Sequence, residues 1–176
     1  LCGTTASLCG IERFGFEGNQ EGVDRAVRYA LRLHAFMLSQ SGIPVIYSGD
    51  EIGQVNDYTY KNDPEKRVDS RYIHRGKFDW KLADGRKRKG TVQKELFDGI
   101  GKLRSIRSKE KVFDASANVW TLDTWENGIL GVGAGTGGRA DDSTFLISQK
   151  RTGQPGSKKR ESIWIYIPVK KSAFRQ

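Results

Sequence analysis

Two stretches of the chain place apolar residues at helical spacing. From 24 to 39 these positions recur every three or four residues, and Asp24 lies where a helix N-cap belongs. A second set of the same period runs from 91 to 108, with cations gathered toward its C-terminal end, where the helix dipole favours them. We predict two amphipathic helices, the first of them well buried and ending near Gly42.

An unbroken apolar run, Ile-Pro-Val-Ile-Tyr at 43–47, follows the first predicted helix. A continuous apolar strand directly after a buried helix is typical of a parallel sheet that is covered on both faces. From 48 to 80 the period disappears and the chain becomes polar, aromatic and rich in turn residues. A loop of this length is usually functional, and its aromatic residues favour an ordered one.

Strand patterns dominate the rest of the chain. Apolar runs at 119–125 and 129–132 flank a segment that contains Asn-Gly, which predicts an antiparallel hairpin. The glycine cluster at 133–138 matches G-x-G-x-x-G, but neither an amphipathic helix nor a suitably placed acidic residue follows it, so we interpret it as a flexible turn. Further strand-like runs occur at 145–147 and 163–169.

Composition and charge indicate a globular protein and disfavour a nucleic-acid partner. The 176 residues are 36% hydrophobic and 29% charged, and no apolar run approaches the roughly 20 residues that span a bilayer. The net charge is +9, of which residues 134–176 carry +6 and residues 1–133 carry +3. The basic excess therefore belongs mostly to the C-terminal tail, and we expect no nucleic-acid partner and no membrane contact.

The N-terminal residues suggest an incomplete chain. It begins at Leu1 rather than Met, and we interpret it as a fragment. Cys2 and Cys9 stand in a stretch of small residues with no metal-ligand pattern around them. We interpret them as two ordinary buried thiols rather than a disulfide or a zinc site.

The candidates for chemistry are Asp50 and Glu51, which follow the predicted strand at 43–47. Ligands bind beyond the carboxyl ends of parallel strands, so polar residues at this position are candidates for a site. Neighbouring side chains point to opposite faces, however, whereas retaining glycosidases need two carboxyls about 5 Å apart. We expect one of the two to frame a pocket and the other to anchor the loop, and purely structural roles for both remain an alternative.

A family resemblance adds to these patterns. Residues 42–53, Gly-Ile-Pro-Val-Ile-Tyr-Ser-Gly-Asp-Glu-Ile-Gly, resemble the last barrel strand of the α-amylase family, glycoside hydrolase family 13. Within that family, residues 3–12 and the loop from 56 to 75 resemble the amylosucrases and sucrose hydrolases.

This resemblance implies an α/β fold that is the C-terminal part of a (β/α)₈ TIM barrel. Residues 1–110 would supply helix 7, strand 8, loop 8 and helix 8 of the barrel, and residues 111–133 would begin a C-terminal β-sandwich domain. The likeness stops there. We interpret residues 134–176 as a divergent basic tail from a shifted reading frame or a truncated gene, because periodicity, charge and likeness change together.

The resemblance also implies an activity. Amylosucrases transfer glucose from sucrose to an α-1,4-glucan through a covalent glucosyl-enzyme, using two Asp and one Glu that would precede Leu1. No catalytic residue is therefore assigned within this chain, and we expect the isolated chain to be inactive and the protein cytoplasmic, with no cofactor or metal. A sucrose hydrolase or α-glucosidase of the same family is an alternative, and a basic polyanion-binding module is an alternative from another class.

One sugar-binding residue carries over by resemblance. Arg71, in the Asp-Ser-Arg sequence at 69–71, resembles the amylosucrase arginine that salt-bridges an Asp from the N-terminal half of the barrel and closes the floor of the glucose pocket. A permanently charged, forked guanidinium can both fix a loop and face sugar hydroxyls. The alternative is that Arg71 only orders its loop. His34, on the apolar face of the first helix, is interpreted as a packed or boundary histidine.

Overall fold

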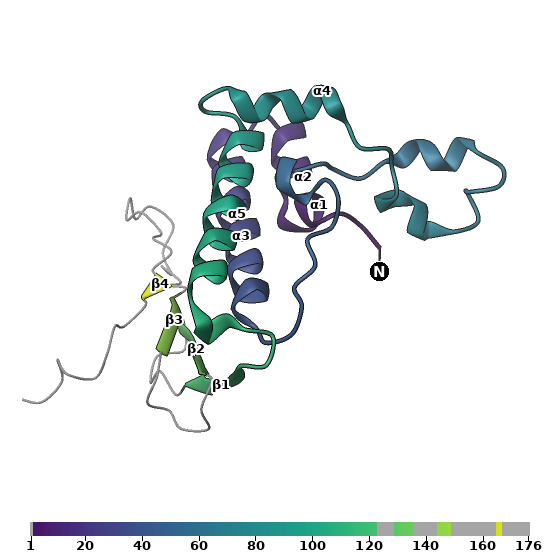
Figure 1. Cartoon of the computed structure of the whole chain (residues 1–176). Coiled ribbons are helices and arrows are strands. Elements are labelled where there is room, and N and C mark those ends of the chain that lie inside the picture. The colour runs from purple at the N-terminus through teal and green to yellow at the C-terminus, as the bar shows by residue number, and fades with distance from the viewer. Residues whose placement is uncertain (1, 123–128, 136–143, 149–164, 167–176) are drawn as a thin grey trace, which may run out of the picture. The chain divides into compact units, whose positions relative to one another are not determined.

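The computed structural model describes residues 2–122, 129–135, 144–148 and 165–166 (Figure 1). The α-helices are α1 (Thr5–Cys9), α2 (Ile11–Phe16), α3 (Gln20–Ser39), α4 (Trp80–Ala83) and α5 (Val92–Lys109). The 3₁₀ helices are η1 (Asp50–Ile52), η2 (Tyr58–Asn62), η3 (Ser70–His74), η4 (Asp84–Lys87) and η5 (Lys111–Phe113). The strands are β1 (Asn118–Leu122), β2 (Ile129–Gly135), β3 (Thr144–Ser148) and β4 (Ile165–Tyr166).

The chain divides into two units, one built from residues 1–34 with 45–102 and the other from 35–44 with 103–176. The long helices α3 and α5 contribute residues to both. The candidate site residues Asp50, Glu51 and Arg71 all belong to the first unit.

Helix α3 confirms the first predicted helix, but it begins at Gln20 rather than after Asp24. The side chain of Asn19 accepts a hydrogen bond of 2.9 Å from the Gly22 amide, as an N-cap does. Asn and Asp cap helices about equally well, so the sequence alone does not choose between Asn19 and Asp24. The helix stops at Ser39, and Gly42 follows with a φ of 83°, as expected for a C-terminal glycine.

Helix α5 confirms the second predicted helix and buries Leu96 and Ile100. It lies beside α3 (Figure 1), and a Cβ built on Gly99 would come within 2.5 Å of a Leu31 methyl group. The core of the first unit comprises Ala6, Cys9, Ile11, Val23, Ala26, Val27, Ala30 and Leu96. Each fully buried branched aliphatic side chain contributes about 1.5–3 kcal/mol, so this core accounts for much of the unit's stability.

The predicted parallel strand at 43–47 is wrong. These residues form no strand, and Ile43, Val45 and Tyr47 are 86%, 76% and 47% exposed. A buried parallel strand needs hydrogen-bonded neighbours on the same sheet, and the described residues before it form helices instead. The apolar run is therefore not part of a sheet, and three of its five side chains are exposed.

The hairpin prediction is confirmed, although the turn at 123–128 lies outside the described residues. Strands β1 and β2 pair antiparallel, with Trp120 opposite Gly133, in a sheet of order β1-β2-β3-β4. A Cβ on Gly133 would come within 2.4 Å of the Trp120 ring, so glycine is required by this close approach. Strand β2 extends through Gly135, into the cluster expected to be a turn, and Ala134 packs with Phe113 in the core of the second unit.

The expected fold class is therefore corrected. A (β/α)₈ barrel is a sheet of parallel strands that closes on itself. In the described residues every strand pair is antiparallel, and the sheet is open, with β1 and β4 at its edges. A β-sandwich needs a second sheet, and the described part of the chain contains one. None of the helices in the described part has the length and apolar character needed to cross a membrane. The reading-frame hypothesis for 134–176 stays a prediction.

Candidate functional site

The loop expected to carry the site is ordered by a tight turn at its start. Residues 50–52 form η1 between Gly49 and Gly53, whose φ angles are 101° and 65°. Side chains other than glycine rarely adopt this backbone region, so both glycines are needed for the turn. Ile52, within the turn, is 1% exposed and anchors it by burial.

Asp50 faces His34 of helix α3. The distance from His34 Nε2 to Asp50 Oδ2 is 3.6 Å, and both side chains are largely buried, 5% and 11% exposed. The other ring nitrogen, His34 Nδ1, lies 2.8 Å from the Ala30 carbonyl oxygen. Because a carbonyl oxygen only accepts hydrogen bonds, Nδ1 carries a hydrogen. The other nitrogen, Nε2, faces the Asp50 carboxylate.

This arrangement favours a charged imidazole. Burial alone would lower the pKa of His34, but the interactions with Asp50 and the Ala30 carbonyl raise it above its ordinary 6.5. The same carboxylate affects the thiol of Cys9 on α1. Burial, and then the charge of Asp50, raise the pKa of Cys9 to about 11, so this thiol is protonated at neutral pH and is a poor nucleophile.

Glu51 is engaged inside its own turn. Its Oε2 accepts a hydrogen bond of 3.0 Å from the amide of Gly49, the residue that precedes η1. The two carboxylates therefore contact different groups: Asp50 faces the His34 ring of α3, and Glu51 binds the Gly49 amide in the turn backbone. The two carboxylates do not flank a common space as a glycosidase pair would.

Arg71 is held by the residue two positions before it. In η3 its Nε lies 2.9 Å and 3.0 Å from the two carboxylate oxygens of Asp69, and its Nη2 lies 2.8 Å from Oδ2. Asp69 also caps η3 by accepting from the Arg71 amide. The guanidinium, by hydrogen bond and charge, lowers the pKa of Asp69 to about 2.

The side of the Arg71 guanidinium that carries Nη1 is free to bind a ligand. Its side chain is 63% exposed, and within the described part of the chain Nη1 has no partner. In those same residues no direct contact joins Arg71 to Asp50 or Glu51. The structure thus places the three candidate residues in one unit but does not assemble them into one site.

Two residues that the sequence patterns did not single out connect this loop to its surroundings. Asn56 Oδ1 accepts from the Thr4 amide at 2.8 Å, and the Asn56 amide donates to Ser7 Oγ at 3.0 Å. Gln54 accepts from the Asp79 amide at 3.1 Å and donates to the Lys77 carbonyl at 3.0 Å. The signal in the sequence for these contacts was the presence of polar side chains, Gln54 and Asn56, within a long loop. Buried backbone groups in such a loop need hydrogen-bond partners.

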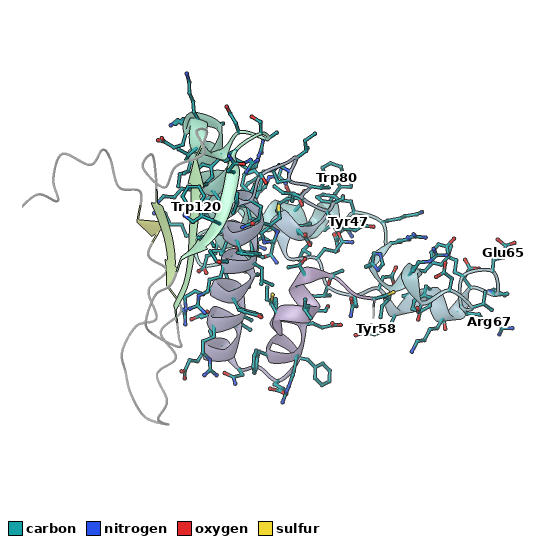
Figure 2. The ribbon with its side chains drawn as sticks, turned by 90° about the horizontal axis from the view of Figure 1, so that it is seen from below. Tyr47, Tyr58, Glu65, Arg67, Trp80 and Trp120 are labelled. Carbon is teal, nitrogen blue, oxygen red and sulfur yellow. The ribbon has the colours of Figure 1, made fainter. Side chains whose placement is uncertain are left out.

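Aromatic residues lie along the loop and at its two ends. Tyr47 and His74 meet edge to face with ring centroids 5.7 Å apart, and His74 Nδ1 is buried without a hydrogen-bond partner in the described residues. Figure 2 labels Tyr47, Tyr58 and Trp80, which are 47%, 50% and 73% exposed. Phe78 packs edge to face on Trp80 at 4.7 Å. Exposed aromatic faces of this kind can stack on sugar rings or on other apolar groups.

A scan against models of known protein families finds none that matches this chain. Within the described residues, no group of three or more His, Cys, Asp or Glu side chains is arranged to hold a metal ion. The candidate site is therefore described by its own geometry. Its distinctive elements are the buried His34 and Asp50 pair and the exposed, oriented Arg71.

Proposed function

We propose that this chain is part of an amylosucrase-like enzyme of the α-amylase family, which transfers glucose from sucrose to an α-1,4-glucan with retention of configuration. The observation that carries the proposal is the guanidinium of Arg71, exposed and fixed by Asp69 within the Asp-Ser-Arg sequence. An oriented guanidinium loses little entropy on binding and can donate to two sugar hydroxyls at once. The proposal does not rest on the barrel fold.

The catalytic carboxylates are assigned to residues outside this chain. Retaining transfer needs a nucleophile and an acid/base about 5 Å apart. Asp50 is directed to His34 and Glu51 to the Gly49 amide, so neither is available as one of that pair. The role proposed for this chain is to present Arg71 to the sugar.

The first test is an activity assay. The purified chain is incubated with sucrose and glycogen, and released fructose is measured. We expect no fructose above background, because the residues of the proposed catalytic pair are not present. Fructose release would contradict the assignment of the catalytic carboxylates to residues outside the chain.

The second test concerns Arg71 itself. Sucrose is raised to about 100 mM, which suits weak, millimolar binding, and NMR shifts of the Arg71 Nε–H and of the amides at 69–74 are followed. We expect shifts at these positions that disappear in Arg71→Gln and persist in Arg67→Gln, an exposed arginine of the same loop. An unchanged Arg71 signal at every sucrose concentration would sink the proposed role.

A sucrose hydrolase or α-glucosidase is the alternative within the family. It would use the same glucose pocket and differ only in passing the glucosyl group to water. Product analysis separates the two, because a transferase lengthens glucan chains whereas a hydrolase releases free glucose.

A further inference from the structure

The His34 and Asp50 pair is built as a proton-dependent contact. His34 is 4% exposed, and both of its ring nitrogens face groups that accept hydrogen bonds, the Ala30 carbonyl and the Asp50 carboxylate. A neutral ring has one N–H, so with Nδ1 bonded to Ala30 its Nε2 would turn a lone pair toward the carboxylate. While Asp50 is ionised, only the doubly protonated ring satisfies both neighbours.

We propose that His34 and Asp50 form a pH-dependent latch that holds the turn at 49–53 against helix α3. The latch is closed while the imidazole carries both protons and opens when the Nε2 proton passes to solvent. This inference does not depend on the proposed sucrose chemistry, because it concerns the folding of the turn alone.

Within the described residues, few charged or titratable groups act on the latch. Asp50 on η1 faces the imidazole directly, and the Cys9 thiol on α1 lies within the field of Asp50. Glu51 is turned away, because its carboxylate is bound to the Gly49 amide. The protonation of His34 is therefore governed chiefly by burial and by Asp50, with the Ala30 carbonyl as the third influence.

Opening has a defined cause and a defined location. Loss of the proton leaves the Asp50 carboxylate, with 11% of its side chain exposed, beside an uncharged ring, and a buried carboxylate without a counter-ion is costly. The turn can respond by rotating at Gly49 and Gly53, which border it. Gln54 follows directly and would be carried along.

The direction of the pH dependence follows from the raised pKa of His34. The closed turn binds the proton more tightly than the open one, so the latch contributes fully below the ordinary pKa of 6.5. Its contribution is lost as the pH rises through the higher pKa of the closed state. Above that pKa the turn should be at its loosest.

The experiment uses the full chain labelled with ¹⁵N. The charge state of each histidine is read from its ring nitrogen shifts between about pH 5 and pH 9, a range that brackets ordinary histidine titration. Amide exchange at Ile52, Gly53 and Gln54 is measured in parallel and corrected for base catalysis. We expect His34 to titrate above 6.5. Between pH 6.5 and the pKa of His34 in the closed state, protection of the turn amides should fall by up to tenfold per pH unit. Protection of the Ile100 amide in α5 should not change over the same pH range.

Two matched variants separate the latch from a general effect of charge. Asp50→Asn should lower the titration midpoint of His34 and remove the pH dependence of turn protection. Glu51→Gln changes a neighbouring carboxylate that does not face the ring, and it should leave both unchanged. His34→Gln, which carries no titrating proton, should leave the turn poorly protected at every pH.

The proposal fails if His34 titrates at or below its ordinary value. It also fails if corrected protection of the turn does not change with pH in the unaltered chain, or if Glu51→Gln has the same effect as Asp50→Asn. The unaltered chain alone supplies the first two outcomes, so the test stands even if a variant does not fold.

Discussion

The guanidinium of Arg107 in α5 donates a hydrogen bond of 2.8 Å from Nη2 to the carbonyl oxygen of Gly42. Its Nη1 donates to the carbonyls of Leu38 and Gln40 at 2.6 Å and 2.7 Å. A single cation thus serves carbonyl groups at and beyond the C-terminus of α3, where the helix leaves them without partners and the dipole favours positive charge. The sequence predicts cations at the C-terminal end of α5, and the structure shows that one of them, Arg107, caps α3.

Replacing Arg107 with Met should destabilise the chain by about 1.5–3 kcal/mol, the range for hydrogen bonds made by a charged group. Methionine keeps the apolar stem but none of the donors. Arg104→Met is the matched control, because Arg104 is exposed on the same helix, and it should change the free energy of unfolding by less than about 0.5 kcal/mol. Urea unfolding measures both, and equal losses would contradict the capping role.

Two glycines of α5 should respond to alanine with opposite signs. A Cβ on Gly101 meets nothing within 4 Å, so Gly101→Ala should stabilise the chain by about 0.5–1 kcal/mol through helix propensity. A Cβ on Gly99 would come within 2.5 Å of Leu31, and Gly99→Ala should cost about 1 kcal/mol, because moving Leu31 outweighs that gain. Thermal unfolding of the two variants decides the matter, and stabilisation by both would refute the close helix contact.

The carboxyl of Asp69 should titrate at about 2, as followed by its ¹³C shift. Arg71→Gln should raise the midpoint toward the ordinary 3.8, because it removes the charged hydrogen-bond donor. Arg67→Gln, in the same loop, should leave it in place. Since the folded pKa is the lower one, the stabilising contribution is present above 3.8 and is lost as the pH falls through about 2. A midpoint unaffected by Arg71→Gln would contradict the ion pair.

Gln54→Ala should loosen the segment that presents Trp80. The Gln54 amide bonds both the Lys77 carbonyl and the Asp79 amide, and Asp79 in turn caps α4. Losing about 1.4 kcal/mol of hydrogen bonding corresponds to roughly tenfold faster exchange of the Asp79 amide. Gln20→Ala, at an exposed side chain far along the sequence, is the control. Unchanged exchange in Gln54→Ala would show that the segment is held by other contacts.

The sequence predicted those elements whose formation depends on local pattern. Helical spacing located α3 and α5, and Asn-Gly located the hairpin of β1 and β2, because period and turn chemistry act within a few residues. The run at 43–47 failed because hydrophobicity records a tendency to be buried, not the partner that does the burying. Whether such a run becomes a strand depends on what lies beside it.

The barrel and the β-sandwich expected from the family resemblance are not present in the described residues, and the roles of the candidate site residues could not be predicted for a related reason. Asp50 and Glu51 were identified by position, but their neighbours decide their roles, and these are a helix residue for Asp50 and a backbone amide for Glu51. The sequence predicts a packed or boundary histidine at His34, which agrees with its burial but does not reveal that the ring faces the Asp50 carboxylate. A buried histidine on an otherwise apolar stripe was the available signal, because such a ring needs polar partners.

The hydrogen bond between Asn56 and the Thr4 amide spans 52 residues of chain. Contacts of such long sequence separation form only after the entropy of closing the intervening loop has been lost, and they therefore come late on the folding pathway. Helix α1, with five residues, is too short to be stable alone and depends on this closure. It should consequently be among the last segments to dock during folding and among the first to detach when the protein begins to unfold.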